Sequence, residues 1–510
     1  MDPYSPCFCG SGKKLKRCCQ DIYVEVNQAF EKEQNKQHDA ASRIMQGVIE
    51  KHPGNPQAWC FHAQLMMAHN KTDEAEKSLD KAFELREDHP FALLMRASIR
   101  MSEGEIEGAR VLARQAAESY DPQAKDAIGQ VYEIIHEAES KRNNAIAARA
   151  ALRIMVRCDP SHQQLREVLQ TLYGERGPFP AVVCEDFALQ SPPSNAEGER
   201  RKKWDDALNR AASSRIGSLA QAFEELTQSD SNDVAAWHNL GLTQAWLGNN
   251  VEALDAFDKY LELEIDETKA ESIAALCQVL LQGYGLQQRA DFKAYMTQLQ
   301  LAEAEPISKW LQQMAESGKL APIPQGEEQP GAYDFMLLEP VQEGILTTSG
   351  TPQPSWNRII GQLAIRNNLM GISSLSEEAR DQVVASLQEA AGEKIKVLST
   401  RVLPANWSDI ASKAITFPKQ QGEENQKEQQ QRVKGYYEDH WTHQPLTCLG
   451  GNTPVDAVGH KTYRKVLRGL ILFLDQCTNK YFTGIYDFNQ LRRKLGLIEG
   501  QATETEGGTE

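Results

Sequence analysis

A spacing of 34 residues constrains the fold of this 510-residue chain more than any other feature. Pro56 and Pro90 mark the period, and the segment between them carries small and large apolar residues at helical spacing: Trp59, Ala63, Met66, Ala75, Leu79 and Ala82. A second segment has the same phase, with Trp237, Leu240, Gly241, Ala253, Phe257 and Tyr260. Small side chains let two helices approach while large ones fill the space beside them. Each segment therefore predicts a helical pair that must stack on neighbouring pairs to bury its apolar face.

Both segments resemble tetratricopeptide (TPR) repeats, and weaker copies surround them. The resemblance implies a mainly α fold, a TPR-like α-solenoid in two blocks over residues 22–175 and 200–318, with a Pro-rich loop or hinge at 176–199. Such a solenoid presents a concave groove for protein or peptide partners. The repeat register places eight side chains in that groove: Gln57, Cys60, Gln64, Met67, Ala235, His238, Leu242 and Trp246. Of these, Gln64, Met67, His238 and Trp246 are the predicted partner-binding residues. Met67 and Trp246 also suit ordinary packing between repeats.

Four of the ten cysteines lie within thirteen residues: Cys7, Cys9, Cys18 and Cys19. Zinc takes four thiolates at tetrahedral angles, and Gly10 and Gly12 permit the left-handed backbone that folds both pairs onto one ion. Four cations lie between the two pairs: Lys13, Lys14, Lys16 and Arg17. Nearby cations lower the pKa of a thiol, so they favour the thiolate form that binds metal.

The run from Pro6 to Cys19 resembles the SEC-C zinc motif, named for the C-terminal end of the SecA translocation motor. The resemblance implies one Zn2+ in a knuckle over residues 1–21 and a docking role toward other proteins. Disulfides or unliganded thiols are the less favoured alternative, because the chain shows no signal peptide. A terminal knuckle of this size is expected to order its own loop and little else.

Charge limits the partners of the chain. Its 55 basic and 71 acidic residues give a net charge of -16, so no DNA binding and no general affinity for anionic lipid are expected. The basic knuckle is the exception, and three roles are open for its cations. They contact the phosphates of a ribosome or another RNA, they contact an acidic partner, or they only balance the charge of the thiolates. No apolar run approaches the roughly 20 residues of a membrane span, and we expect a bacterial cytoplasmic protein.

Composition changes after a linker at residues 319–334. Residues 335–498 are expected to form a C-terminal α+β domain, followed by a disordered acidic tail at 499–510. Predicted strands cover 335–339, 344–348 and 394–403, and predicted helices cover 356–366, 376–391 and 463–477. The polar tract at 420–431 fits a solvated helix or a disordered loop.

His440 and His443 flank Trp441 at a spacing that puts two imidazoles on one helix face, which suits a second metal or an acid–base pair. No phosphate-binding loop or nucleophile elbow occurs, and no catalytic residue is assigned. The favoured hypothesis is a zinc-binding TPR adaptor or scaffold, not an enzyme, linked to protein export, chaperone or ribosome-associated processes. Two alternatives remain open: an enzyme with its active site within 335–498, and an RNA anchor that uses the basic knuckle.

Overall fold

The structure is a computed structural model, and it describes residues 4, 7, 9, 12–211, 214–302, 305–323, 331–340, 356–418 and 423–498. The chain divides into two compact units. Unit 1 comprises Met1–Pro178 and Asp186–Tyr260, and unit 2 comprises Phe179–Glu185 and Leu261–Glu510. The chain therefore leaves unit 1 for one short segment of unit 2 and then returns to it.

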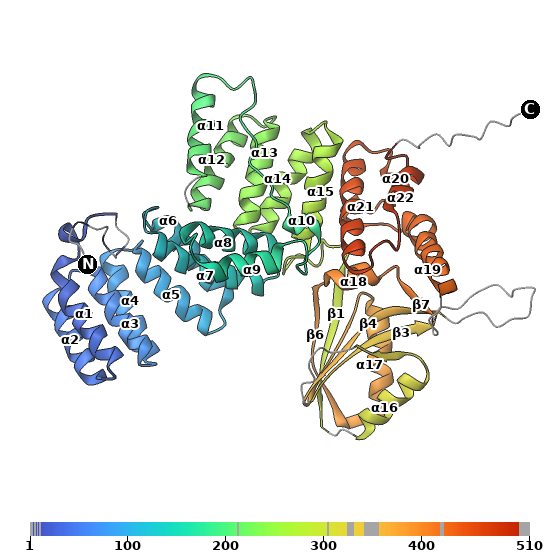
Figure 1. The fold of residues 1–510 in the computed structure, drawn as a ribbon, viewed down its shortest axis with the longest axis horizontal. Coiled ribbons are helices and arrows are strands. Elements are labelled where there is room, and N and C mark those ends of the chain that lie inside the picture. Colours follow the sequence, from blue (N-terminus) through green and yellow to red (C-terminus); the bar gives the residue numbers. More distant parts are fainter. Residues whose placement is uncertain are drawn as a thin grey trace, which may run out of the picture. The chain divides into compact units, whose positions relative to one another are not determined.

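Unit 1 is helical, and its first eight helices pack in consecutive pairs (Figure 1). A short 3-10 turn, η1 (Leu15–Arg17), precedes these pairs. The paired helices are α1 (Gln20–Gln34), α2 (His38–Lys51), α3 (Pro56–Ala68), α4 (Thr72–Leu85), α5 (Pro90–Ser102), α6 (Ile106–Ser119), α7 (Lys125–Lys141) and α8 (Ala145–Cys158). The helices that follow are α9 (Gln163–Tyr173), α11 (Gly198–Arg210), α12 (Ile216–Ser229), α13 (Val234–Trp246) and α14 (Asn250–Leu263).

The repeat pattern read from the sequence has a direct structural counterpart. Trp59 Nε1 donates a hydrogen bond to the Pro53 carbonyl at 2.9 Å, and Trp237 Nε1 makes the same bond to the Ser231 carbonyl at 2.9 Å. A Cβ added at Gly241 of α13 would lie 2.4 Å from a ring carbon of Phe257 on α14, so only glycine lets these two helices approach this closely. The expected apolar positions are buried: Ala63, Met66, Ala75, Leu79, Ala82, Ala253, Phe257 and Tyr260. The predicted solenoid of paired helices is confirmed.

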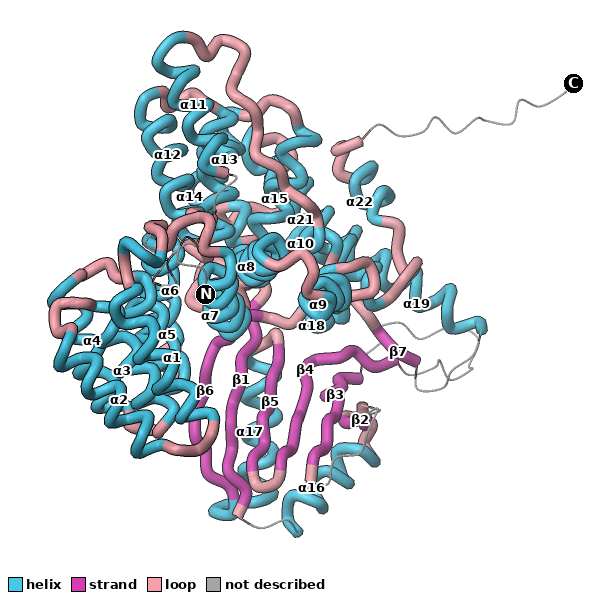
Figure 2. The backbone as a smooth tube through the Cα atoms, turned by 60° about the vertical axis from the view of Figure 1, so that its left-hand side comes forward, coloured by secondary structure: helices cyan, strands magenta, loops and turns pink. Residues whose placement is uncertain are grey.

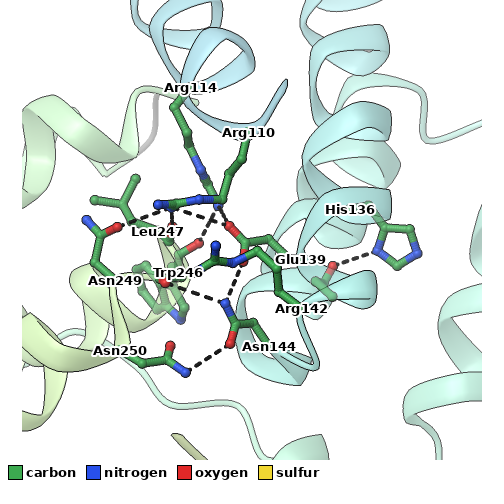
Figure 3. A network of polar contacts seen from close by, with 12 residues as sticks. Arg110, Arg114, His136, Glu139, Arg142, Asn144, Trp246, Leu247, Asn249 and Asn250 are labelled. Atoms are coloured by element: carbon green, nitrogen blue, oxygen red, sulfur yellow. Dashed lines mark hydrogen bonds and ion pairs between the residues drawn. The ribbon is translucent and has the colours of Figure 1, made fainter. Parts of the chain in front are cut away.

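A buried carboxylate connects the early and late helices of unit 1 (Figure 3). Glu139, at the end of α7, is fully buried and accepts hydrogen bonds from Arg114 of α6 at 3.2 Å and from Asn144 at 2.7 Å. Arg114 also donates to the carbonyl of Trp246 at 3.2 Å, and Asn250 donates to Asn144 at 3.0 Å. Through these bonds the helices before and after residues 176–199 belong to one packed body.

Unit 2 contains an antiparallel seven-stranded sheet with the order β2-β3-β4-β5-β1-β6, and β7 also pairs with β4 (Figure 2). Helices α16 (Glu305–Glu316) and α17 (Glu377–Ala391) pack with this sheet around a shared apolar core that includes Leu299, Trp310, Leu363, Ile372 and Leu387. The strands are β1 (Lys293–Leu301), β2 (Leu320–Pro322), β3 (Ala332–Pro340), β4 (Trp356–Arg366), β5 (Leu369–Ser374), β6 (Ile395–Pro404) and β7 (Thr416–Pro418).

The other helices of unit 2 gather around α21, which packs against α15, α18 and α10. They are α10 (Ala181–Cys184), α15 (Glu267–Leu281), α18 (Trp407–Ser412), α19 (Glu423–Gly435), α20 (Pro454–Ala457), α21 (Lys461–Tyr481) and α22 (Phe488–Lys494). Short 3-10 or π turns are η2 (Gly392–Lys394), η3 (Tyr436–His440), η4 (Trp441–His443) and η5 (Thr447–Leu449). Among the described residues, no helix is long and apolar enough to cross a membrane.

The predicted mainly α architecture with a C-terminal α+β region is confirmed, as are the strands at 335–339 and 394–403 and the helices at 376–391 and 463–477. The polar tract at 420–431 contributes to helix α19, and the strand expected at 344–348 lies outside the described residues. Two expectations are wrong. Residues 356–366 form strand β4 instead of a helix, and residues 293–301, expected to be helical, form strand β1.

Neighbouring strands explain the error at β4. Its apolar residues fit a helical period and a strand period equally well, so periodicity alone does not decide between them. The strand pairs with β3 on one side and β5 on the other, and a Cβ added at Gly361 would lie 2.2 Å from the Ser373 carbonyl oxygen. Such non-local pairing outweighs the local preference of the segment.

Candidate metal centre and partner surfaces

The four N-terminal cysteines converge. The Sγ atoms of Cys7, Cys9, Cys18 and Cys19 all lie within 4.8 Å of one another. Cys9 Sγ lies 3.4 Å from Cys18 Sγ, which lies 3.7 Å from Cys19 Sγ. Zinc–sulfur bonds of about 2.3 Å at tetrahedral angles place sulfurs about 3.8 Å apart, so the cluster has the size that a four-thiolate zinc site requires.

The local backbone explains how the two cysteine pairs meet. The Cys7 N–H donates to the Lys13 carbonyl at 2.7 Å, and the Cys18 N–H donates to the Leu15 carbonyl at 3.0 Å. Between them Gly12 has a φ of +71°, the left-handed value expected from the sequence. A Cβ at Gly12 would also lie 2.2 Å from an Asp121 carboxylate oxygen, but that side chain can move aside, so the backbone conformation is what favours glycine here.

Two thiols of the cluster, those of Cys7 and Cys19, have a raised pKa when no cation neutralises them. Hydrogen bonds from Cys7 and Cys9, together with burial, raise the pKa of the Cys19 thiol far above its usual range. For Cys7, a hydrogen bond with Cys19 lowers the pKa, but Cys9 and burial outweigh it and raise the pKa to about 12. Four thiolates in so small a space need a divalent cation, and the donor set fits the soft coordination of zinc.

The sulfur side of the knuckle faces the protein interior. Cys7, Cys9 and Cys19 are 3 to 4% exposed, and Leu15 is 1% exposed. All four belong to the buried cluster that runs through α1 to α5 and includes Cys60. The apolar and sulfur atoms of the knuckle therefore form part of the core of the first repeats. How much of the chain the zinc orders stays a prediction.

The charged side of the knuckle faces solvent. All four cations between the cysteine pairs are exposed: Lys13, Lys14, Lys16 and Arg17. Lys16 Nζ lies 3.7 Å from the centre of the Tyr4 ring, in a cation–π contact, and Lys14 Nζ lies 5.6 Å from it. The knuckle thus presents a basic, aromatic-containing surface while its ligands point inward.

The predicted groove residues have different environments. Gln64, Met67, Ala235 and Trp246 are half-buried, whereas Gln57, Cys60 and Leu242 are buried and His238 is 6% exposed. The His238 ring packs edge-on against Tyr260, and its Nδ1 lies 3.1 Å from the Asn239 side-chain oxygen. The neighbouring Asn239 makes two hydrogen bonds with the backbone of Gln190, in the segment before α11. His238 is therefore packed within unit 1, and a role for it in partner binding stays a prediction.

His440 and His443 do not form a shared site. His440 accepts a hydrogen bond from the Gln444 amide at 2.7 Å and lines a cavity of about 310 Å³, whereas His443 Nδ1 lies 3.1 Å from the Asp439 carbonyl oxygen and does not line that cavity. His440 ends the π turn η3 and His443 ends the 3-10 turn η4, so the two histidines do not lie on one regular α-helix as their spacing had suggested.

The sequence did not indicate the other residues of this cavity. Asp409, Lys413 and Tyr436 line it with His440. Burial raises the pKa of Asp409, lowers that of Lys413 and raises that of Tyr436 to about 12. The Tyr436 hydroxyl is buried and has no hydrogen-bond partner among the described residues. Asp409 lies on α18, Lys413 is the C-cap of that helix, and Tyr436 and His440 lie on η3, so no local motif could identify the group.

Two family models match the chain. The SEC-C motif matches residues 5–21, and a tetratricopeptide repeat matches residues 33–99. A search of curated proteins found no match. Among solved structures, a tetratricopeptide repeat protein from Parabacteroides merdae is 12% identical, with 53% of this chain and 89% of that chain covered and a TM-score of 0.24. The TPR domain of P58(IPK) is 12% identical, with 51% and 88% covered and a TM-score of 0.19. The family matches confirm that the chain contains a SEC-C motif and TPR repeats.

Proposed function

We propose that the chain is a zinc-binding adaptor that recognises a protein partner through the basic face of its knuckle and the adjoining TPR repeats. TPR repeats indicate a scaffold for protein–protein interaction. The observation that carries the proposal is the two-sided knuckle: the cysteines are buried in the repeat core, and the four cations between them are exposed.

Zinc has a structural role in this proposal. Cys7, Cys9, Cys18 and Cys19 would fill all four positions of a tetrahedral ion, which leaves no open position for a substrate. The chemistry that the ion supplies when bound is the cross-linking of a short loop. The residues of the chain then hold the basic face on a fixed backbone, so its cations lose little conformational freedom on binding.

The partner of the basic face is expected to be an acidic protein segment in a cytoplasm. Exposed Lys and Arg side chains attract acidic groups at long range and raise the association rate, an effect that falls as salt rises. The half-buried Gln64 and Met67 would extend the contact along the first repeats, and Trp246 would do the same on α13. Protein export, chaperone and ribosome-associated processes all provide partners of this kind.

A charge-reversal variant tests the proposal. Changing Lys13, Lys14, Lys16 and Arg17 to Glu leaves the cysteines in place, so zinc content should stay at one per chain while partner capture from a lysate is lost. The matched control reverses three exposed cations on α11, Arg201, Lys202 and Lys203, and should keep the partner. Capture that survives the knuckle reversal contradicts the proposal. Capture that nuclease abolishes favours the RNA anchor instead.

Zinc itself has a separate test. Elemental analysis of protein purified under reducing conditions should find one tightly held zinc, and changing Cys7 and Cys18 to Ser should remove it. Wild-type protein without zinc would rule out this part of the proposal.

The cavity in unit 2 supports a second candidate function, the binding or conversion of a small polar molecule. Lys413 and the unpartnered Tyr436 hydroxyl offer hydrogen-bond donors, and Asp409 and His440 offer groups that exchange protons. Perturbed pKa values in one cavity favour such a site. Native mass spectrometry of the purified chain should detect a bound molecule that Tyr436→Phe and Lys413→Met both release, and an empty wild-type cavity would count against this function.

A further inference from the structure

Three side chains outside the cysteine knuckle form a second group with the composition of a metal site: Glu33, His38 and His69. One Glu33 carboxylate oxygen lies 2.9 Å from His38 Nδ1, and the other lies 2.8 Å from His69 Nε2. The two imidazole rings meet edge to face with their centres 5.3 Å apart. The three ligand atoms, one from each residue, all lie within 4.8 Å of one another.

The repeat architecture builds this group from the ends of three helices. In both α1 and α3 the residue directly after the C-cap is left-handed: Lys36 and Asn70 each have a φ of 58°. Glu33 lies in the last turn of α1, and His69 is the C-cap of α3. Since α1 packs against α3 and His38 begins α2, the same local turn in successive repeats brings the three groups together.

We propose that Glu33, His38 and His69 bind a second zinc ion, through one carboxylate oxygen, Nδ1 and Nε2. Zinc bonds to nitrogen and oxygen of about 2.0 to 2.2 Å at tetrahedral angles place ligand atoms roughly 3.3 to 3.5 Å apart. One oxygen of Glu33, Oε2, lies 3.0 Å from His38 Nδ1 and 2.8 Å from His69 Nε2, so these two separations need to widen by only about half an ångström. Two imidazoles and one carboxylate are a donor set that zinc accepts with its fourth position open.

The surroundings of the group favour a cation. The C-terminal ends of α1 and α3 carry partial negative charge and lie at this site, which offsets the positive end of α2. The Glu33 and His69 side chains are 16% and 13% exposed, whereas His38 is 56% exposed. Two ligands are thus held by packing and the third reaches the surface, so a water or a group of a partner can take the fourth position.

This site goes beyond the proposed adaptor function and differs from the cysteine centre in chemistry. The cysteine centre is closed, buried and thiolate-rich, and it should hold zinc tightly. The histidine–carboxylate group has three harder ligands and is open to solvent, so its metal should exchange faster. An alternative in which the three groups form only an ion-paired cluster predicts no second metal.

Cobalt titration of the full-length chain with its first zinc bound tests the proposal. Wild-type protein should take up one further Co2+ with weak visible absorption and without new thiolate charge-transfer absorption, which would report the cysteines instead. His69→Gln and His38→Gln should lower this second affinity about 100-fold or more, because outer-shell changes alone cost about 10- to 100-fold. His38 is exposed, so that variant should fold normally.

The matched control is His52→Gln. His52 is the C-cap of α2, and its Nδ1 lies 3.2 Å from an Asp21 carboxylate oxygen. Like His69, it is a helix-capping histidine next to one carboxylate, but this pair has no second imidazole to complete a metal site. This control should bind the second cobalt like wild type. A wild-type chain that takes up no second metal, or a His38→Gln variant that binds it as tightly as wild type, overturns the proposal. Loss of the first zinc would bear on the cysteine centre alone.

Discussion

Replacing Glu139 by Gln tests how unit 1 is held together, because this one carboxylate joins three segments (Figure 3). It is 0% exposed, and its two oxygens accept hydrogen bonds from Arg114 at 3.2 Å and Asn144 at 2.7 Å. The Arg114 guanidinium also reaches the Trp246 carbonyl, which ends α13. Gln has nearly the same shape as Glu but carries no charge, so the substitution removes the anion without leaving a cavity.

The expected cost follows from what the substitution leaves behind. The Arg114 side chain is 13% exposed and loses its buried counter-ion. Removing one partner of a buried ion pair costs about 3 to 5 kcal/mol. Arg110, whose Nη1 lies 3.7 Å from Glu139, keeps a 2.7 Å ion pair with Glu107, which places the cost at the lower end. About 3 kcal/mol corresponds to a roughly 100-fold increase in local opening.

Hydrogen exchange read by mass spectrometry measures this opening in the intact chain. Peptides from α6, α7 and α13 should exchange about 100-fold faster in Glu139→Gln, whereas peptides from the sheet of unit 2 should not change. Adding Arg114→Met should recover part of the loss, since it removes the unpaired charge, with a coupling of about 1 to 3 kcal/mol. Exchange rates within about twofold of wild type would refute the argument that the carboxylate holds these helices together.

Two glycines supply a matched control for the same network. Gly248 has a φ of +71°, and a Cβ there would lie 2.4 Å from a Glu139 carboxylate oxygen. Gly104 has a φ of +79° and open space around the same position. Alanine at either site imposes the left-handed strain of about 1 to 2 kcal/mol, but only Gly248→Ala adds the clash. Equal destabilisation of the two variants would contradict the close packing at Glu139.

Three further predictions concern other parts of the chain. Chelation of the knuckle zinc should lower the melting temperature of unit 1 by several degrees, because the cysteines share its core; an unchanged calorimetric midpoint would contradict this. Burial lowers the pKa of His89 to about 4, so the free energy of unfolding should fall by up to about 3 kcal/mol as pH drops from 6.5 to 4. His89→Asn keeps the helix-cap acceptor, and urea titrations of this variant should show a weaker dependence of stability on pH. Lys465 Nζ donates to the Leu261 and Glu264 carbonyls at 2.6 and 2.5 Å, so Lys465→Met should cost about 2 to 4 kcal/mol by thermal unfolding, and a cost below 1 kcal/mol would be inconsistent with these bonds.

The linkage at His89 has a definite sign. The folded state keeps the imidazole neutral because it is 2% exposed and accepts from the Ala92 N–H, so protons bind the unfolded chain more readily below the usual pKa of about 6.5. The nearby Arg86 lowers the pKa further, while Cys9 and Asp88 raise it. Stability is therefore fully present above about pH 6.5 and is lost on acidification.

Local signals in the sequence carried most of the helical prediction. The spacing of Trp59 from Pro53 and of Trp237 from Ser231 is six residues in both repeats, and each indole makes the same bond. Strands β1 and β4 were missed because their apolar residues fit the period of a helix as well as that of a strand. Only pairing with neighbouring strands decides which structure forms. Such pairing joins residues far apart, for example Thr297 with Thr400, and a single sequence contains no record of it.

The same distinction separates the two candidate metal sites. The cysteine ligands lie within thirteen residues, so their spacing alone revealed them. Glu33 and His69 are 36 residues apart and meet only because successive repeats stack. The sequence did contain one signal of this site. Asn35 and His69 are the C-caps of α1 and α3 and lie one 34-residue period apart, so a comparison of the polar residues near equivalent helix ends would have paired Glu33 with His69.

The burial of the knuckle changes how zinc and partner binding should be related. Because Cys7, Cys9 and Cys19 point into the repeat core, a partner at the basic face touches Lys and Arg side chains and not the ion. Zinc loss should then weaken binding by releasing the backbone that positions those cations, and should also lower stability. Charge reversal should weaken binding equally while stability stays the same. If zinc loss and charge reversal weaken partner binding to the same extent, but only zinc loss lowers stability, then the metal positions the binding surface without forming part of it.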